Sequence, residues 1–283
     1  MQFLALTLAF CASAVALPAQ QTPIPLEDPI KSPFPIHHSC NATEQRQLAT
    51  ALQEAVSLAD HAKQHILSWG NESAIYRKYF GDRPSITAIG AYEIIIHGNS
   101  SNTLFRCDNP DGNCDLPEYG GHWRGENATD ETVICPLSYT TRRSLTTICS
   151  QGYTVSGSET NTFWAGDLLH RLYHMPAIGQ GLVEHYADGY EGVLEFAEGN
   201  RTEATHDSET LQYFALEVYA YDVAVPGVGC VGGEEESGSG TGDVAESEDP
   251  AQEGTDEAAE DDTAEEDIPE NCHTHEGGEL HCI

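Results

Sequence analysis

The negative charge of this chain is concentrated in one stretch near its C-terminal end, which limits where a folded domain can lie. The 283 residues include 12 Lys or Arg and 46 Asp or Glu, giving a formal net charge of −34. All twelve cations precede residue 202, whereas residues 234–270 contain seventeen carboxylates and no cation. Such a segment cannot bury enough apolar surface to offset the entropy lost on ordering. We therefore expect a disordered acidic linker over 234–270, and no nucleic-acid binding, because phosphate groups would be repelled.

The N-terminal residues have the features of a secretory signal peptide. An apolar stretch covers 3–16 and ends in the small-residue motif Ala14-Val15-Ala16, which suits cleavage before Leu17. No later apolar run is long enough to span a bilayer, and the polar C-terminus lacks the hydrophobic tail of a lipid-anchor signal. We predict a signal peptide over 1–16 and a secreted, extracellular protein, either free or associated with the cell wall. Five glycosylation sequons favour the same route, at Asn41, Asn71, Asn99, Asn127 and Asn200.

The cysteines indicate a disulfide-stapled domain. Loss of Cys11 with the signal peptide leaves eight, an even number that predicts four disulfides in an oxidising compartment. A short turn separates Cys107 from Cys114 and favours their pairing, but the sequence does not determine the other connections. The predicted pairs are Cys107–Cys114, Cys135–Cys149, Cys40–Cys230 and, in the tail, Cys272–Cys282.

The remaining sequence divides into an extended arm, one domain and a tail. Residues 17–39 are rich in proline, and we expect them to be extended. Residues 40–233 are long enough for a single core and should form a helix-rich α+β domain. Residues 271–283 form a Cys/His-rich tail. Apolar spacing and turn residues predict a helix over about 43–69 closed by Gly70, a continuation over 76–80, a strand or helix at 85–97, strands at 132–136 and 144–155, and a late helix near 209–223.

Two histidines stand four residues apart in the segment Asp167-Leu-Leu-His170-Arg171-Leu-Tyr-His174, which Pro176 follows closely. Thr162 is placed to cap the start of a helix here, and the proline to end it. At this spacing both imidazoles share one helix face and can bind zinc, as in H-E-x-x-H peptidases. Histidines at this spacing also occur as ordinary polar residues at the edge of a core. The apolar residues around the pair favour the metal-ligand interpretation.

Arg171 takes the place of the glutamate that activates the zinc-bound water in those peptidases. A guanidinium stays protonated at any working pH and cannot act as a general base. The sequence therefore predicts a metal site that lacks its hydrolytic group, and we assign no catalytic residue. Asp167 could orient the His170 imidazole, pair with Arg171, or form an ordinary surface ion pair.

A zinc site needs further ligands, and the segment 181–190 offers three. His185 is the first choice, because three histidines leave a fourth coordination position open, and Asp188 and Glu184 are the reserve candidates. His206 resembles a histidine at a helix start more than a ligand. The other helical pair, His61 and His65, lies off the apolar stripe of its helix and is expected on a solvated face.

The tail is a second candidate metal site. The segment Cys272-His273-Thr-His275-Glu-Gly-Gly-Glu-Leu-His281-Cys282 places three histidines and two cysteines close together. A disulfide would close a loop that presents His273, His275 and His281, with Glu276 or Glu279 as oxygen donors. Reduced cysteines would instead give a Cys2His2 set, and the remaining alternative is a plain polar tail. Secretion favours the disulfide.

The motifs together resemble a known family. The runs 133–139 and 168–174, with Cys149 between them, resemble deuterolysin-type zinc peptidases, which are zincins. In those enzymes a G-T-x-x-D segment supplies the third ligand, and Gly181-Leu-Val-Glu-His185 places His185 at the matching position. The H-R-x-x-H run and the Cys/His-rich tail are more similar to the fungal pH-regulated antigen or zincophore family, which includes a major mould allergen.

This resemblance implies a zincin-like fold and the capture of extracellular Zn²⁺, with the metal returned to a surface zinc transporter. It also implies binding to host proteins in some members. The metal ligands carry over to His170, His174 and His185, with His273, His275 and His281 as an accessory site. The missing glutamate favours a binding protein over an enzyme. The alternatives are a weak metallopeptidase that uses Glu184 or Asp188, and a cell-wall or host-binding antigen with structural zinc.

Overall fold

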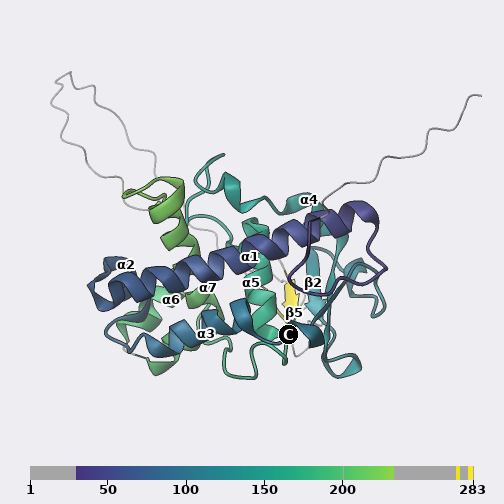
Figure 1. Ribbon diagram of the computed structural model, residues 1–283, viewed down its shortest axis with the longest axis horizontal. Coiled ribbons are helices and arrows are strands. Elements are labelled where there is room, and N and C mark those ends of the chain that lie inside the picture. Colours follow the sequence, from purple (N-terminus) through teal and green to yellow (C-terminus); the bar gives the residue numbers. More distant parts are fainter. Residues whose placement is uncertain (1–29, 200, 233–271, 275–279, 283) are drawn as a thin grey trace, which may run out of the picture.

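The computed structural model describes residues 30–199, 201–232, 272–274 and 280–282, and its helix-rich α+β architecture agrees with the prediction. The helix α1 (Ala42–Trp69) crosses the molecule and packs on α3 (Ile86–His97), α5 (Trp164–His174) and α7 (Ser208–Tyr219) (Figure 1). The shorter helices α2 (Ala74–Phe80) and α6 (Gly189–Glu198) pack on each other and on α7, whereas α4 (Pro136–Thr141) packs on the sheet. Among the described residues, no helix combines the length and apolarity needed to cross a membrane.

Local signals define α1 as the sequence predicted. Asn41 and Glu44 form a capping box, in which the Asn41 side chain accepts from the Thr43 and Glu44 amides and the Asn41 amide donates to the Glu44 carboxylate at 2.7 Å. The helix ends at Gly70, whose φ of 47° suits glycine. Capping at one end and a glycine stop at the other explain why its bounds could be read from the sequence.

The solvated face predicted for His61 and His65 is wrong for His65. His65 is 5% exposed, and its two ring nitrogens lie 2.7 Å from Asp222 and 2.7 Å from Ser73. His61 is partly exposed and lies 3.1 Å from the same Asp222 carboxylate. Asp222 belongs to a π-helical turn that follows α7, Ala220–Ala224. This turn packs on α1 from far along the chain, so the periodicity of α1 alone could not reveal it.

Two other local predictions also fail. The segment 144–155 is not a strand but a 3-10 turn at Leu145–Thr147 followed by loops, in which Cys149 and Gln151 have φ values of 63° and 55°. Positive φ is incompatible with an extended strand, whatever the β propensity of Thr, Ile and Val. The element at 85–97, which the sequence left open as a strand or a helix, is the helix α3. Thr162 does not cap α5, because Phe163 occupies the N-cap position and the cap has no side-chain hydrogen bond.

A mixed sheet lies beside the helices in the order β1-β3-β2-β5-β4. The strand β3 (Glu131–Ile134) pairs in parallel with β1 (Leu104–Arg106) and antiparallel with β2 (Tyr119–Trp123). The other two strands come from the tail: β5 (Leu280–Cys282) runs parallel to β2, and β4 (Cys272–Thr274) runs antiparallel to β5. The end of the chain therefore returns to the domain.

The disulfides differ from the predicted pairs. The structure joins Cys40 to Cys107, Cys114 to Cys135, and Cys149 to Cys230, so the pairs Cys107–Cys114, Cys135–Cys149 and Cys40–Cys230 are wrong. The physical reason is strand pairing between distant segments. Ile36 pairs with Phe105 and so brings the start of α1 to the end of β1. In the tail, Cys272 stands opposite Cys282 in the β4–β5 ladder, and their disulfide stays a prediction.

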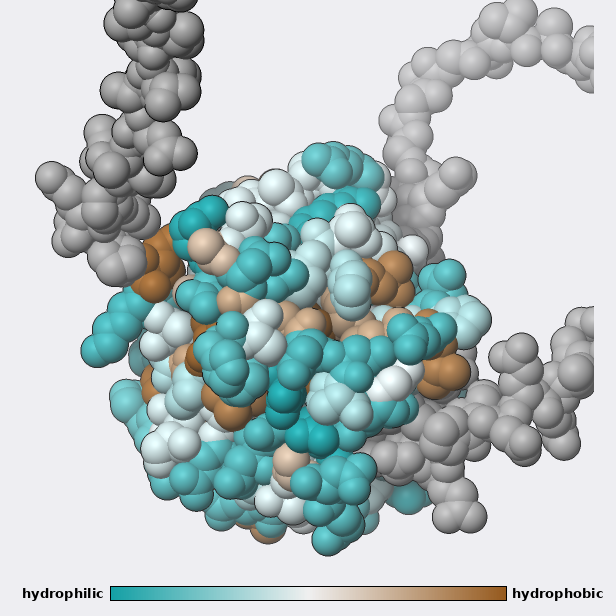
Figure 2. Space-filling model, turned by 90° about the vertical axis from the view of Figure 1, so that its right-hand side faces the viewer, coloured by the Kyte–Doolittle hydropathy of each residue, from teal (hydrophilic) through white to brown (hydrophobic). Residues whose placement is uncertain are grey.

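The surface has no broad apolar face in the view of Figure 2. The residues drawn in colour there are mainly hydrophilic, and the apolar ones form small separate patches. Isolated apolar residues are normal on soluble domains, whereas interfaces usually expose larger contiguous patches. On this side of the molecule, polar residues are therefore better candidates for a functional site than an apolar patch.

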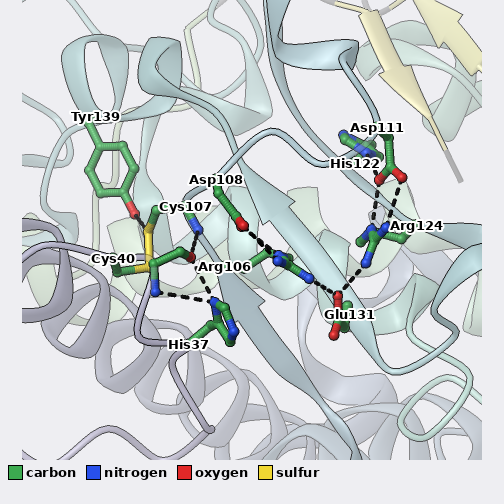
Figure 3. A network of polar contacts seen from close by, with 11 residues as sticks. His37, Cys40, Arg106, Cys107, Asp108, Asp111, His122, Arg124, Glu131 and Tyr139 are labelled. Carbon is green, nitrogen blue, oxygen red and sulfur yellow. Dashed lines mark hydrogen bonds and ion pairs between the residues drawn. A yellow bond between two sulfur atoms is a disulfide. The ribbon is translucent and has the colours of Figure 1, made fainter.

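A charged network ties β1, β2 and β3 together. Figure 3 shows Arg106 and Arg124 on either side of Glu131, with each guanidinium also bound to an aspartate. Arg124 donates to both oxygens of Asp111, at 2.7 and 2.9 Å. A network held by paired guanidinium donors is more rigid than an isolated surface pair. Its members are Arg106, Asp108, Asp111, His122, Arg124 and Glu131.

This network should make stability depend on pH in the acid range. The hydrogen bonds from Arg124 hold the pKa of Asp111 at about 2, below its ordinary value. The contribution is therefore fully present above about pH 4 and is lost as the pH falls towards 2. We expect Arg124→Gln to lower the free energy of unfolding by roughly 2 kcal/mol at pH 7, and by progressively less towards pH 3. Urea denaturation over this range, with Arg201→Gln as a surface control, measures the effect; an equal loss at every pH would contradict it.

Candidate metal centre

Three histidines from two segments meet at the C-terminal end of α5. His170 and His174 lie on the last two turns of this helix, most of which is buried. The chain then continues through 175–184 and brings the ring of His185 beside both of them. His170 is 2% exposed, whereas His174 and His185 are half-buried. The structure therefore brings together the three residues that the sequence singled out.

The three imidazoles have the geometry of a metal-ligand set. The Nε2 atoms of His170 and His174 lie 3.0 Å apart. The ring centroids of His185 lie 4.7 Å from those of His170 and 4.6 Å from those of His174. One nitrogen from each ring falls within 4.8 Å of the other two. Zinc–nitrogen bonds of about 2.0–2.1 Å in a tetrahedral site separate neighbouring nitrogens by roughly 3.3 Å, so small adjustments would seat an ion here.

The loop that carries His185 is fixed to the start of α7. The Glu184 amide donates to the His206 carbonyl at 3.2 Å, and the Ser208 amide donates to the Glu184 carbonyl at 2.9 Å. The Ser208 hydroxyl lies 3.2 Å from Nδ1 of His185. With Nδ1 engaged in this way, Nε2 is the nitrogen that would bind a metal. A hydrogen bond of this kind orients the ring, as is usual for ligating histidines.

Asp207 is the buried anchor of the same loop. One carboxylate oxygen accepts from the Tyr186 and Ala187 amides, at 2.7 and 3.2 Å. The other accepts from the amide and hydroxyl of Thr210, and so caps α7. Burial raises the pKa of Asp207 to about 6, although these hydrogen bonds act in the opposite direction. Asp207 thus links the loop that carries His185 to the N-terminus of α7.

Arg171 is held inside the protein. Its guanidinium donates to both oxygens of Asp167, at 2.9 and 3.0 Å, and both side chains are 3% exposed. Arg142 approaches the same carboxylate at 3.4 Å. The structure shows Asp167 paired with Arg171, and the surface ion pair is wrong because the pair is buried. No proton acceptor therefore occupies position 171.

Two carboxylates lie near His185. Asp188 and Glu209 each place an oxygen within 4.8 Å of a nitrogen of this histidine. Glu209 is buried, and its Oε2 atom accepts from the Gly189 amide at 2.7 Å. The sequence did not single out Glu209, because an acidic residue in the first turn of a helix is common. Glu184, the other reserve candidate, is exposed and joins none of the metal-ligand groups among the described residues.

The remaining histidine candidates lie in different surroundings. The ring of His206 packs against Tyr186, with centroids 5.7 Å apart, and His206 joins none of the ligand groups in the described part of the chain. In the tail, His273 stands opposite His281 in the β4–β5 ladder. His275 lies outside the described residues.

Comparison with known proteins finds a matching family model and several similar proteins from fungi. A family model described as "HRXXH: Putative peptidase family" matches residues 4–233. Antigen 1 of Emericella nidulans is 81% identical over 282 residues, covering 100% of both chains. Major allergen Asp f 2 of Aspergillus fumigatus is 60% identical over 88% of this chain and 84% of its own. The pH-regulated antigen PRA1 of Candida albicans is 53% identical, over 70% of this chain and 67% of its own.

The chain is also similar to a solved structure. A zinc peptidase from Grifola frondosa superposes with a TM-score of 0.46 and 17% sequence identity, over 63% of this chain and 97% of that one.

Proposed function

This chain belongs to the HRXXH family, as its motifs predicted, and from this premise we propose that it is a secreted protein that binds zinc outside the cell. The proposed ligands are His170, His174 and His185. Capture of extracellular zinc, and its transfer to a surface transporter, are part of the same proposal. The antigen and allergen names of the relatives suit a protein exposed at or beyond the cell surface.

The observation that carries the proposal is the meeting of three imidazoles with a buried arginine at position 171. Neutral imidazole is a good ligand for zinc, and three of them on two rigid segments form a prepared site. Asp167 keeps the Arg171 guanidinium in place, so the position next to His170 cannot receive a proton from a metal-bound water. Such a site binds a metal without the group that most zinc peptidases use for turnover.

Zinc titration of protein made without a tag tests this function. We expect His185→Ala to weaken zinc binding by at least about 10- to 100-fold, because it removes a ligand held in place by Ser208. The matched control is His97→Ala, since His97 is an exposed histidine that contacts Glu93. Equal zinc affinity in wild type and His185→Ala, measured by competition with a coloured chelator, would contradict the assignment.

The family description and the carboxylates near His185 favour one alternative, a weak metallopeptidase. Asp188 or Glu209 would then have to replace the missing base, and loss of a well-placed base typically costs about 10²- to 10⁴-fold in rate. Cleavage of an unfolded protein substrate that is lost in His170→Ala and in Glu209→Gln would support this function. Binding of zinc without such cleavage would favour capture alone.

A further inference from the structure

Three side chains from distant parts of the chain form a hydrogen-bonded row near the end of α1. The Ser73 Oγ atom lies 2.7 Å from Nε2 of His65, and Nδ1 of the same ring lies 2.7 Å from Oδ2 of Asp222. His65 belongs to α1, Ser73 precedes α2, and Asp222 belongs to the π-helical turn after α7. Hydrolases with a serine nucleophile share this order of hydroxyl, imidazole and carboxylate on unrelated folds, and are recognised by this geometry.

The neighbouring contacts set the direction of both hydrogen bonds. The Tyr76 amide donates to Ser73 Oγ at 3.1 Å, which leaves the proton of the hydroxyl to be donated to His65. A carboxylate only accepts hydrogen bonds, so Nδ1 of His65 carries the proton that points at Asp222. Nε2 then presents its lone pair to the serine hydroxyl. In this tautomer the imidazole can take a proton from a nucleophile.

His65 is held firmly in this orientation. It is buried, and its ring packs edge-on against Phe214, with centroids 6.0 Å apart. The Asp222 oxygen that it contacts also lies 3.1 Å from Nε2 of His61, one turn earlier in α1. The carboxylate is therefore fixed by two imidazoles of one helix. A base next to a nucleophile and oriented by a third group is the arrangement that activates a serine.

A cavity opens onto the row. It has a volume of about 320 Å³, and its lining includes all three members of the row. The other lining residues are Trp69, Glu72, Ala74, Ile75 and Tyr221. Trp69 and Tyr221 are exposed aromatic residues, which suit the apolar part of a small ligand. The carboxylates of Glu72 and Asp222 disfavour an anion here, so the cavity fits a small uncharged molecule.

We propose that Ser73, His65 and Asp222 form a second functional site, which hydrolyses small uncharged carboxylic esters. Ser73 Oγ bonds to the carbonyl carbon of the ester while its proton moves to Nε2 of His65. The bond from this carbon to the alcohol oxygen then breaks, and the alcohol leaves with the proton from His65. A water molecule gives a proton to His65 and attacks the acyl group, and the acid leaves as Ser73 regains its proton. Asp222 is a positioning residue, which orients the ring and stabilises its protonated form.

A fluorophosphonate probe tests this site in the full-length protein, because it reacts much faster with an activated serine than with an ordinary one. The serine oxygen bonds to phosphorus, fluoride leaves, and His65 takes the proton. We expect a single label per chain, placed on Ser73 by mass spectrometry of its peptides. Asp222→Asn, a change of little volume, should slow labelling by at least about 100-fold, and Asp222→Glu should recover part of the rate. Hydrolysis of p-nitrophenyl acetate should change in parallel.

The controls separate the nucleophile from the other roles of Ser73. This residue caps α2 and completes the sequon of Asn71, so Ser73→Asn, which keeps a capping oxygen, is compared with Asn71→Gln, which removes the sequon alone. We expect the label to be lost in Ser73→Asn and kept in Asn71→Gln. A wild-type protein that takes up no probe, or takes it up at another residue, would overturn the proposal. So would an unchanged rate in Asp222→Asn.

A chelator distinguishes this site from the metal centre. None of the three residues belongs to a metal-ligand group within the described ranges, so labelling of Ser73 should be the same with and without EDTA. Labelling that EDTA abolishes would assign the reactivity to the metal and refute the serine site. The zinc-binding proposal is tested by zinc titration alone, and its failure would leave the labelling result unaffected.

Discussion

The double variant His170→Ala/His174→Ala is expected to lose at least about 1,000-fold in zinc affinity, which corresponds to roughly 4 kcal/mol or more. The change removes both ligands that α5 supplies and leaves His185 alone on its loop. Their Nε2 atoms lie 3.0 Å apart on a helix packed into the core, so no neighbouring side chain of α5 can take their place without unwinding it. Competition with a chelator of known affinity measures the loss.

The matched control for this variant is again the exposed His97→Ala, and circular dichroism should establish that both proteins remain folded. Truncation of His170 also removes buried atoms, so a modest fall in thermal stability is expected and does not bear on the metal assignment. Zinc affinity within about tenfold of the wild type would refute the proposed metal centre on α5 and would leave the tail as the candidate zinc site.

The second large effect concerns the buried ion pair between Asp167 and Arg171, in the helix that carries two of the proposed ligands. Asp167→Ala should lower the free energy of unfolding by about 3–5 kcal/mol, because it leaves the buried guanidiniums of Arg171 and Arg142 without their shared carboxylate. For a domain of this size the melting temperature should fall by roughly 10 °C or more. Thermal and urea denaturation of metal-free protein measure both quantities.

Glu203→Ala provides the comparison, since Glu203 contacts Arg201 at 3.8 Å on the surface, where an ion pair contributes little. We expect no measurable change in that variant. A similar small effect for Asp167→Ala would mean that water reaches the guanidiniums, and the buried pair would lose its structural role.

Local sequence signals predicted α1, α2, α5 and α7, left α3 open as a strand or a helix, and missed α4 and α6. The apolar spacing and the glycine at position 70 predicted the bounds of α1, and the spacing of His170 and His174 with the nearby proline placed α5. His65 was misjudged because its partner Asp222 lies 157 residues further along the chain. When a segment far along the chain buries a helical residue, the apolar periodicity of that helix cannot reveal it.

The disulfides and the metal centre show the same limit: features within one segment could be predicted, whereas contacts between distant segments could not. The pairing of Cys40 with Cys107 follows from contacts between distant strands, so proximity in sequence favoured the wrong partner, Cys114. His185 was accessible to prediction because it lies close after α5 and is a good zinc ligand. Glu209 and the docking of the tail on β2 were not, since each depends on segments that only the folded chain brings together.

The buried pair between Asp167 and Arg171 has an evolutionary consequence. Arg171→Glu alone would not recreate a hydrolase, because two carboxylates would then stand one helical turn apart in a buried region, with mutual repulsion added to the cost of burying them. We expect a change towards catalysis to need exchanges at both positions, because either single exchange leaves an uncompensated charge in a buried region. The Asp167–Arg171 pair therefore couples these two positions, so that a single substitution at either one is expected to cost stability before it can alter the chemistry of the site.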